Sequence, residues 1–107
     1  MFTLSKSNTY SWPVVVEFPV SGGKFHKETF DAEFLRLSQT EIAQIGETVN
    51  DKDAIKRVMV GWKGVTDNGE DLPFSEEALD RMLDIPLVSM AILAAYRDSV
   101  LGIKAKN

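Results

Sequence analysis

The sequence predicts an α+β fold: an N-terminal β-hairpin over residues 12–36, followed by about four α-helices over residues 38–102. Apolar residues in the first third alternate with a period of two, which is typical of strands with one buried face. From Ser38 onward they recur at spacings of three and four, which is typical of amphipathic helices. The chain has 107 residues, of which 44% are hydrophobic. We therefore expect residues 1–107 to form a single domain around one core.

The hairpin is predicted from two apolar strands around a glycine turn. The first strand reads WPVVVEFPV, which is rich in β-branched residues. Its two prolines cannot donate a backbone hydrogen bond, so either this strand lies at the edge of a sheet or the prolines mark its ends. Ser21-Gly22-Gly23 follows, and glycine accepts the positive φ of a tight turn. The apolar face is expected to hold Val14, Val16, Phe18, Phe30, Ala32 and Phe34.

The helices are predicted from their capping residues. Ser38 and Glu41 have the spacing of a capping box, which starts the first helix. Asn50 or Asp51 caps a second helix, whose apolar residues continue at helical spacing toward Val60 and Gly61. Residues 61–73 form a connector with an Asp-Asn-Gly turn, and Ser75 caps the third helix.

The last helix is expected from about Pro86 to Leu101. Proline is tolerated at the start of a helix, and Gly102 is well placed to end it. Most of the circumference of this helix is apolar, more than one small core can cover. Two alternatives remain open: the helix is central, or part of it faces another subunit or a partner.

Charge and composition exclude several classes of function. The net charge of −4 argues against nucleic acid as a partner, because phosphate binding needs a clustered cationic surface. The sequence contains no cysteine, which excludes disulfides and thiolate chemistry. No apolar run approaches the roughly 18 residues that span a bilayer, so no membrane partner is expected. Residues 1–10 lack the features of a signal peptide.

No residue pattern in the sequence points to a catalytic, metal or cofactor site. His26 is the only histidine and sits among charged residues, which indicates a solvated strand face. The acidic turn around Gly69 fails the EF-hand pattern, because Gly64 would take the first ligand position. We therefore expect a protein that is not an enzyme and holds no cofactor.

Two regions are candidates for binding a partner. Trp62 lies between two glycines and either fills a gap in the core or anchors a partner, since tryptophan is enriched at interface hot spots. The exposed part of the last helix is the main candidate, with Trp62 and Phe74 as lesser ones. The candidate partner-binding residues are Trp62, Phe74, Leu87, Met90, Ile92, Leu93 and Tyr96.

An ordered set of short motifs resembles the tail assembly chaperones of tailed bacteriophages. The resemblance covers nearly the whole chain, although each piece alone is weak. In the first half it comprises Trp12-Pro13-Val14, Phe18-Pro19, Gly22-Gly23, Phe30, Phe34 and Leu37-Ser38 with Glu41. In the second half it comprises Val60-Gly61-Trp62, Gly64-Val65, Asp67, Gly69, Leu72, Phe74-Ser75, Leu79, Pro86, Ala94-Ala95-Tyr96, Gly102 and Lys106-Asn107.

The resemblance implies a binding function in the cytoplasm of a host bacterium. Such chaperones bind the long, helical tape measure protein, keep it soluble while the tail assembles, and are absent from the finished virion. The tail tube protein is a further candidate partner, and a homo-oligomer is expected if the same face self-associates. The alternative is a structural tail or connector subunit that is retained in the virion.

Many members of this family are also made as a longer product by ribosomal frameshifting near the end of the gene. Ala105-Lys106-Asn107 is compatible with a slippery heptamer in which AAA and AAC encode the last two residues. Reading the gene tests this hypothesis, because other codons at those positions would remove this slip site.

Overall fold

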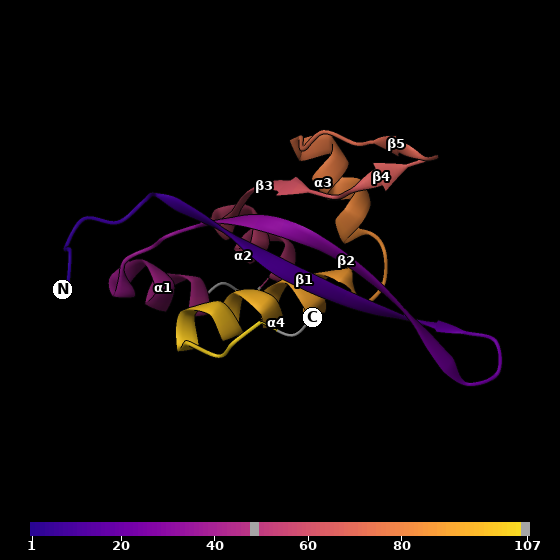
Figure 1. Ribbon diagram of the computed structural model, residues 1–107, viewed down its shortest axis with the longest axis horizontal. Helices are drawn as coiled ribbons and strands as arrows, with labels where there is room; N and C mark the ends of the chain where they lie inside the picture. The colour runs from indigo at the N-terminus through magenta and orange to yellow at the C-terminus, as the bar shows by residue number, and fades with distance from the viewer. Residues whose placement is uncertain (48–49, 106–107) are drawn as a thin grey trace.

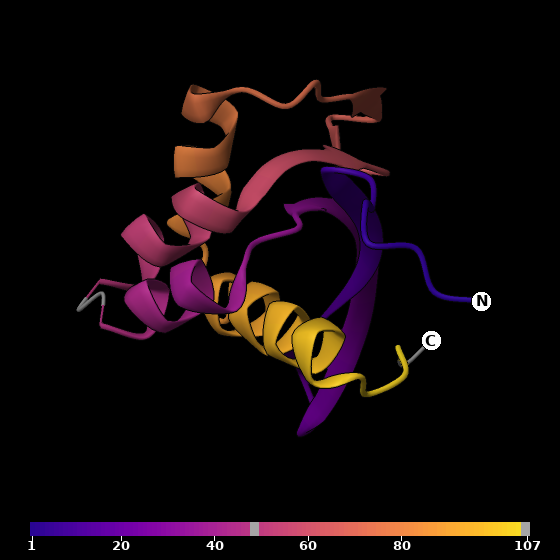
Figure 2. The same ribbon diagram turned by 90° about the vertical axis from the view of Figure 1, so that its left-hand side faces the viewer.

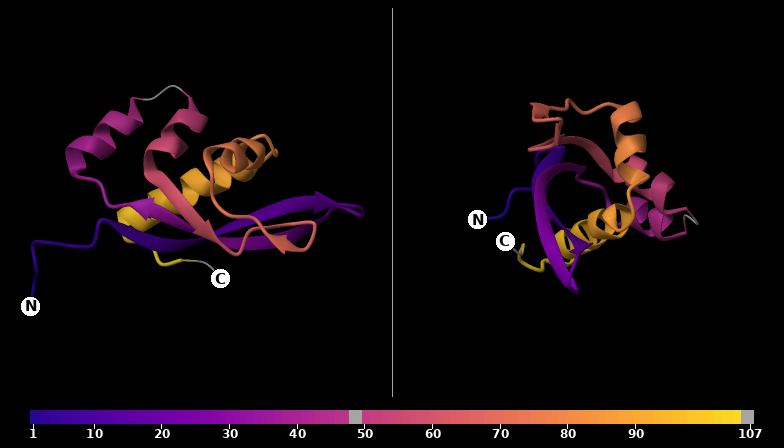
Figure 3. Two further views of the ribbon diagram at one scale, coloured as in Figure 1. Left: turned by 90° about the horizontal axis from the view of Figure 1, so that it is seen from above. Right: turned by 90° about the vertical axis from the view of Figure 1, so that its right-hand side faces the viewer.

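A computed structural model describes residues 1–47 and 50–105, and its elements form an α+β fold (Figure 1). A three-stranded antiparallel sheet curves around helices that lie on one of its faces, as two perpendicular views show (Figure 2, Figure 3). Lys106 and Asn107, on which the proposed slip site falls, lie outside the described residues.

The predicted hairpin is confirmed and is slightly longer than expected at its start. Strand β1 (Thr9–Val20) pairs with β2 (Lys24–Leu35) without interruption from Thr9 opposite Leu35 to Val20 opposite Lys24. The predicted range of 12–36 therefore began three residues late and ended one residue late. Gly22 and Gly23 close the turn with φ values of 89° and 73°, a conformation that disfavours residues with a Cβ.

The two prolines of β1 lie on the open edge of the sheet. The backbone N–H of Arg36 donates to the carbonyl oxygen of Asn8 at 2.8 Å, just beyond the end of the ladder. Since antiparallel bonding alternates, the even-numbered residues of β1 bond to β2, and the odd-numbered ones face the open edge. Pro13 and Pro19 are odd-numbered, so their missing N–H groups remove donors from the edge and none from the ladder.

The first two helices begin at the predicted caps. Helix α1 (Gln39–Gly46) starts with a capping box, in which the Glu41 N–H donates to Ser38 Oγ at 3.2 Å and the Ser38 N–H donates to Glu41 Oε1 at 3.0 Å. Helix α2 (Asp51–Val58) starts at Asn50, whose side chain accepts from the Lys52 N–H at 2.8 Å. Each cap satisfies backbone donors that a helix start leaves free.

The second helix is shorter than predicted, and a third strand takes its place. The prediction carried the helix toward Val60 and Gly61, but β3 (Met59–Lys63) follows α2 directly and pairs with β2. The prediction that the connector begins at Gly61 is wrong for the same reason. The missing Cβ of Gly61 lets Glu33 lie against it, with Glu33 Oε1 3.0 Å from where a Cβ would stand.

A small hairpin and a capped helix follow. Strands β4 (Thr66–Asp67) and β5 (Glu70–Asp71) pair around Asn68 and Gly69, whose φ values of 52° and 80° fit the predicted turn. Helix α3 (Glu76–Leu83) starts at Ser75, whose Oγ accepts from the Ala78 N–H at 3.0 Å. The predicted cap of the third helix is therefore confirmed.

The last helix, α4 (Val88–Leu101), lies inside the curve of the sheet and packs along β1 (Figure 2). It begins two residues after the predicted Pro86, because residues 85–88 form a turn. Gly102 ends it with a φ of 78°, as predicted.

One hydrophobic core joins the hairpin to α2, α3 and α4. The hairpin turn extends beyond this core along the longest dimension of the molecule, which measures 48 × 29 × 28 Å (Figure 1). The core comprises Val14, Val16, Phe30, Ala32, Phe34, Ile55, Val58, Met59, Leu79, Leu83, Val88, Ile92 and Tyr96.

Candidate partner-binding site

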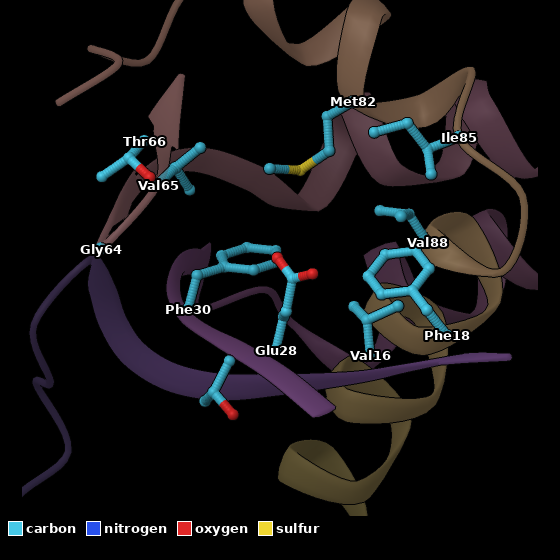
Figure 4. Close-up of a pocket in the computed structure, with 11 residues that line it drawn as sticks. Val16, Phe18, Glu28, Phe30, Gly64, Val65, Thr66, Met82, Ile85 and Val88 are labelled. Carbon is cyan, nitrogen blue, oxygen red and sulfur yellow. The ribbon is translucent and has the colours of Figure 1, made fainter. Parts of the chain in front are cut away.

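An open apolar groove, here called the hairpin groove, lies between the outer part of the hairpin and the segments on either side of α3 (Figure 4). Its volume is about 180 Å³. Glu28, Thr29, Gly64 and Thr66 also line it. Its apolar lining consists of Val16, Phe18, Phe30, Val65, Met82, Ile85 and Val88.

The hairpin side of the groove continues the buried face of the sheet past the helices. Val16 is 3% exposed, whereas Phe18 on the same face is half-buried and Val20 is 47% exposed. The alternation of β1 therefore places Phe18 toward the core side, at the point where the core ends. This is why an aromatic ring remains open to solvent in the groove.

Met82 and Val65 form the opposite side, and polar contacts position their segments. The guanidinium of Arg81 in α3 donates to Asp67 in β4 at 3.0 Å. The Leu72 N–H donates to the Val65 carbonyl oxygen at 2.9 Å and closes the base of the small hairpin. Arg81 is next to Met82 in the sequence, and Val65 itself takes part in the second contact. The two contacts therefore hold α3 and the small hairpin in place on this side of the groove.

A strained turn carries Ile85 at one end of the groove. The Val88 N–H donates to the Ile85 carbonyl oxygen at 3.3 Å, with Pro86 and Leu87 between them. Leu87 has φ 77° and ψ −18°, the values of the third residue of a type II turn, a position that favours glycine. A leucine there is strained and 42% exposed, and Ile85 is 45% exposed. The turn thus presents two apolar side chains to solvent.

The one charged side chain among the described residues that line the groove is acidic. Glu28 is part of the lining, and its carboxylate lies 3.8 Å from His26 Nε2 in an exposed pair that contributes little. Asp84, which ends α3 next to Ile85, is exposed. An apolar groove with carboxylates at its margin favours an apolar segment that carries positive charge.

Trp62 and Phe74 contribute to the packing of the monomer. The Trp62 indole N–H donates to the Leu72 carbonyl oxygen at 2.8 Å. The Trp62 ring lies edge-on to Phe74 at 4.9 Å and to Phe30 at 6.5 Å between centroids. Both side chains are half-buried against the core. The geometry therefore favours the core interpretation of Trp62 and gives Phe74 the same role.

The candidate residues of α4 separate into a buried and an exposed set. Ile92 is fully buried and Tyr96 is 6% exposed, so these two are corrected to core residues that no partner touches without opening the fold. They were chosen because the helix is apolar nearly all round, and its periodicity alone does not say which side faces the sheet. Leu93 is half-buried, and Leu87 and Met90 are exposed at 42% and 67%.

A second hollow of about 490 Å³ lies near α1 and the end of α4, between Tyr10, Ile42 and Val100. Hydrogen bonds cross this seam: Tyr10 Oη and Ser99 Oγ are 2.7 Å apart, and Ser99 Oγ donates to the Tyr96 carbonyl oxygen at 2.7 Å. These contacts hold α4 to β1. We therefore regard the seam as structural and the hairpin groove as the better docking site.

The titratable groups with shifted pKa values lie outside the groove. Lys56 Nζ of α2 lies 2.8 Å from Asp80 Oδ1 of α3, and this contact ties the two helices together. The hydrogen bond raises the pKa of Lys56 and lowers the pKa of Asp80. The Ser38 N–H lowers the pKa of Glu41 in its capping box. Burial raises the pKa of Tyr96 to about 12. These shifts report capping, inter-helix contact and burial.

The remaining residues singled out in the sequence have ordinary surroundings. His26 is exposed on the hairpin, and the acidic turn at Asn68 and Gly69 is a tight hairpin loop. Within residues 1–47 and 50–105, acidic, histidine and cysteine side chains form no group of three or more that could hold a metal ion. In the same part of the chain, the helices are too short or too polar to cross a bilayer.

Sequence reasoning missed most of the groove. Phe18, Val65, Met82 and Ile85 come from separate segments, and no local pattern links them. One signal was available: proline favours the second position of a turn, and Pro86 occupies that position between Ile85 and Val88. Comparison with known proteins adds no name to the site, because no family model, curated protein or solved structure matches this chain.

Proposed function

We propose that this protein is a phage tail assembly chaperone that binds the tape measure protein and keeps it soluble in the host cytoplasm. The observation that carries the proposal is the hairpin groove, an open apolar surface on a chain of net charge −4. A reversible cover for an apolar helix needs such a groove and a charged exterior. In this role the protein binds and releases, and it transforms no molecule.

The residues that carry the family resemblance support the proposal because several of them frame the groove. Phe18, Phe30 and Val65 line it, and Pro86 belongs to the turn that carries Ile85. Gly69 closes the small hairpin beside it with a φ of 80°. A family that varies widely but retains these positions would retain the groove.

The acidic exterior supports the same role. The solvent-facing side of the hairpin carries Glu17, Lys27, Asp31 and Glu33, all exposed, with Lys27 Nζ 3.8 Å from Glu17. Excess negative charge keeps a protein soluble and discourages two copies from associating through this solvent-facing side of the hairpin. Apolar binding is thereby directed to the other side of the sheet, where the groove opens.

Co-expression with the cognate tape measure protein tests the proposal. We expect the tape measure protein to become soluble and to co-purify with this chain. Ile85→Lys places a charge in the groove and should abolish both effects. Met90→Lys tests the exposed face of α4 instead, and Leu101→Lys, at a site 65% exposed and away from the groove, is the matched control.

The outcomes separate the possible results. Failure of the unmodified chain to solubilise or retain the tape measure protein would refute the proposal. Loss with Met90→Lys but not Ile85→Lys would keep the chaperone function and move its site to α4. A structural tail or connector subunit, the alternative function, would be present in purified virions, from which a chaperone should be missing.

A further inference from the structure

The first residues of the chain form an arm that leaves the body with apolar side chains exposed. Phe2 is 80% exposed and Leu4 is 90% exposed. The arm projects from the end of the molecule opposite the hairpin turn (Figure 1). The arm bends at Leu4. If it straightens, residues two apart share a side, and Phe2 and Leu4 can then enter one groove together. The arm therefore presents two apolar side chains that are not buried against the rest of the molecule.

The base of the arm is fixed to the sheet, which limits its reach. The Arg36 N–H donates to the Asn8 carbonyl oxygen at 2.8 Å, and Arg36 Nε donates to the Ser7 carbonyl oxygen at 3.0 Å. Only residues 1–6 are free of the ladder. Five residues of extended chain, from Ser7 back to Phe2, span at most about 17 Å.

The outer end of the groove is farther away than this. Phe18 lies nine residues beyond Thr9 in the same strand, which corresponds to about 30 Å at the rise of a β-strand. The arm of a molecule therefore cannot place Phe2 against its own Phe18 and Ile85. A second molecule, turned end for end, brings its arm to this groove.

Charge favours the same pairing. Lys6 is the only charged side chain among residues 1–16, and its ammonium lies 4.6 Å from the centre of the Phe2 ring. Glu28 lines the groove, and Asp84 stands beside Ile85. A cationic apolar arm thus meets an acidic apolar groove, which favours their association over that of two arms or two grooves.

We propose that the N-terminal arm of one copy occupies the hairpin groove of a second copy, giving a closed antiparallel dimer with two arm-in-groove contacts. The arm leaves one end of a molecule 48 Å long, and the groove lies toward the hairpin turn at the other end, so one two-fold axis can satisfy both contacts at once. The dimer covers the groove until another apolar segment displaces the arm. This inference does not depend on the identity of that segment.

Sedimentation velocity over a range of concentrations tests the dimer. We expect the unmodified chain to shift from monomer to dimer as its concentration rises. The double variant Phe2→Ser/Leu4→Ser should stay monomeric, whereas Phe25→Ser, which removes a 65% exposed ring outside the groove, should dimerise normally. A monomeric unmodified chain at its solubility limit would overturn the proposal. A dimer that survives the double variant would also overturn it and would place the contact on another face.

Because the sequence contains no cysteine, engineered disulfides locate the contact directly. A Phe2→Cys chain and a tagged Ile85→Cys chain are mixed and oxidised, and the mixed disulfide is measured by mass. We expect it to form several times faster than that between Phe2→Cys and Leu101→Cys chains. Equal rates for the two pairs would contradict arm-in-groove docking, even if a dimer forms.

Discussion

The two ends of the β-hairpin share one strand geometry and have opposite surroundings. Near its open end, Val14 and Phe34 are fully buried under the helices. Near its turn, Val20 is 47% exposed and Phe25 is 65% exposed. The turn projects beyond the described helices (Figure 1). In β1 the apolar alternation runs through both ends, so the exposure of Val20 comes from where the helices lie. Phe25 pairs with Pro19 on the other face of the hairpin, which the helices do not cover. The hairpin groove forms at the boundary between the two.

The largest expected effect compares an aromatic residue from each end. Phe34 packs edge-on against Tyr96 at 5.2 Å and Tyr10 at 6.0 Å. Phe34→Ala leaves a cavity there and should lower the free energy of unfolding by about 3–5 kcal/mol. Phe25→Ala at the exposed end should change it by no more than about 0.5 kcal/mol. Urea unfolding followed by circular dichroism measures both values.

Similar losses for these two variants would contradict the comparison, because they would mean that the turn end is also covered. A third variant sharpens it. Phe18→Ala, at the boundary, should give an intermediate loss, since the ring is half-buried.

Local chemistry explains the parts of the fold that the sequence predicts. The glycine pair at residues 22–23, the capping serines 38 and 75, and Gly102 each act within a few residues, and the structure contains each of them as predicted. The hairpin faces follow from alternation in the same way. Such signals require no knowledge of distant segments.

Non-local contacts explain what the sequence does not predict. Residues 54–60 retain helical spacing of apolar side chains, yet Met59 and its neighbours pair with β2, which lies far away in the chain. The competition between helix and strand is decided by that partner. The hairpin groove joins the hairpin, residues 64–66, α3 and the start of α4, so the sequence did not predict that these segments come together.

The second prediction concerns Tyr96 at the buried end of the hairpin. Burial raises its pKa from an ordinary value of 10.0 to about 12, so the folded state holds the neutral phenol. The contribution of Tyr96 to the free energy of unfolding is fully present below pH 10. It is lost as the pH rises toward 12, because Tyr96 ionises first in the unfolded chain. The loss should reach about 2–3 kcal/mol, at about 1.4 kcal/mol per pH unit. Urea unfolding from pH 9 to pH 12 measures it.

Tyr96→Phe is the control for this pH dependence. The Tyr96 hydroxyl has no hydrogen-bond partner among the described residues, so its removal should leave stability at pH 7 unchanged or raise it slightly. The variant should lose less stability than the unmodified protein between pH 10 and pH 12. An identical alkaline loss in both would show that the Tyr96 hydroxyl is not held in the core.

The smallest expected effect lies at the boundary, in the turn before α4. Leu87→Gly relieves the strain of a leucine at φ 77° and should raise the free energy of unfolding by about 1 kcal/mol, after the greater entropy of unfolded glycine is counted. Leu87→Ala retains a Cβ and should gain nothing. Equal stability of the two variants would mean that the turn is unstrained.

Amide hydrogen exchange, measured with and without the proposed partner, a tape measure protein, tests the central claim most directly. If an apolar segment of that protein fills the hairpin groove, exchange should slow in the two loops that form its rim, residues 64–66 and 84–88. It should remain unchanged at the surface of α1 and at Leu101. Protection confined to the outer face of the sheet or to the end of α4, with the rim loops unaffected, would contradict the claim.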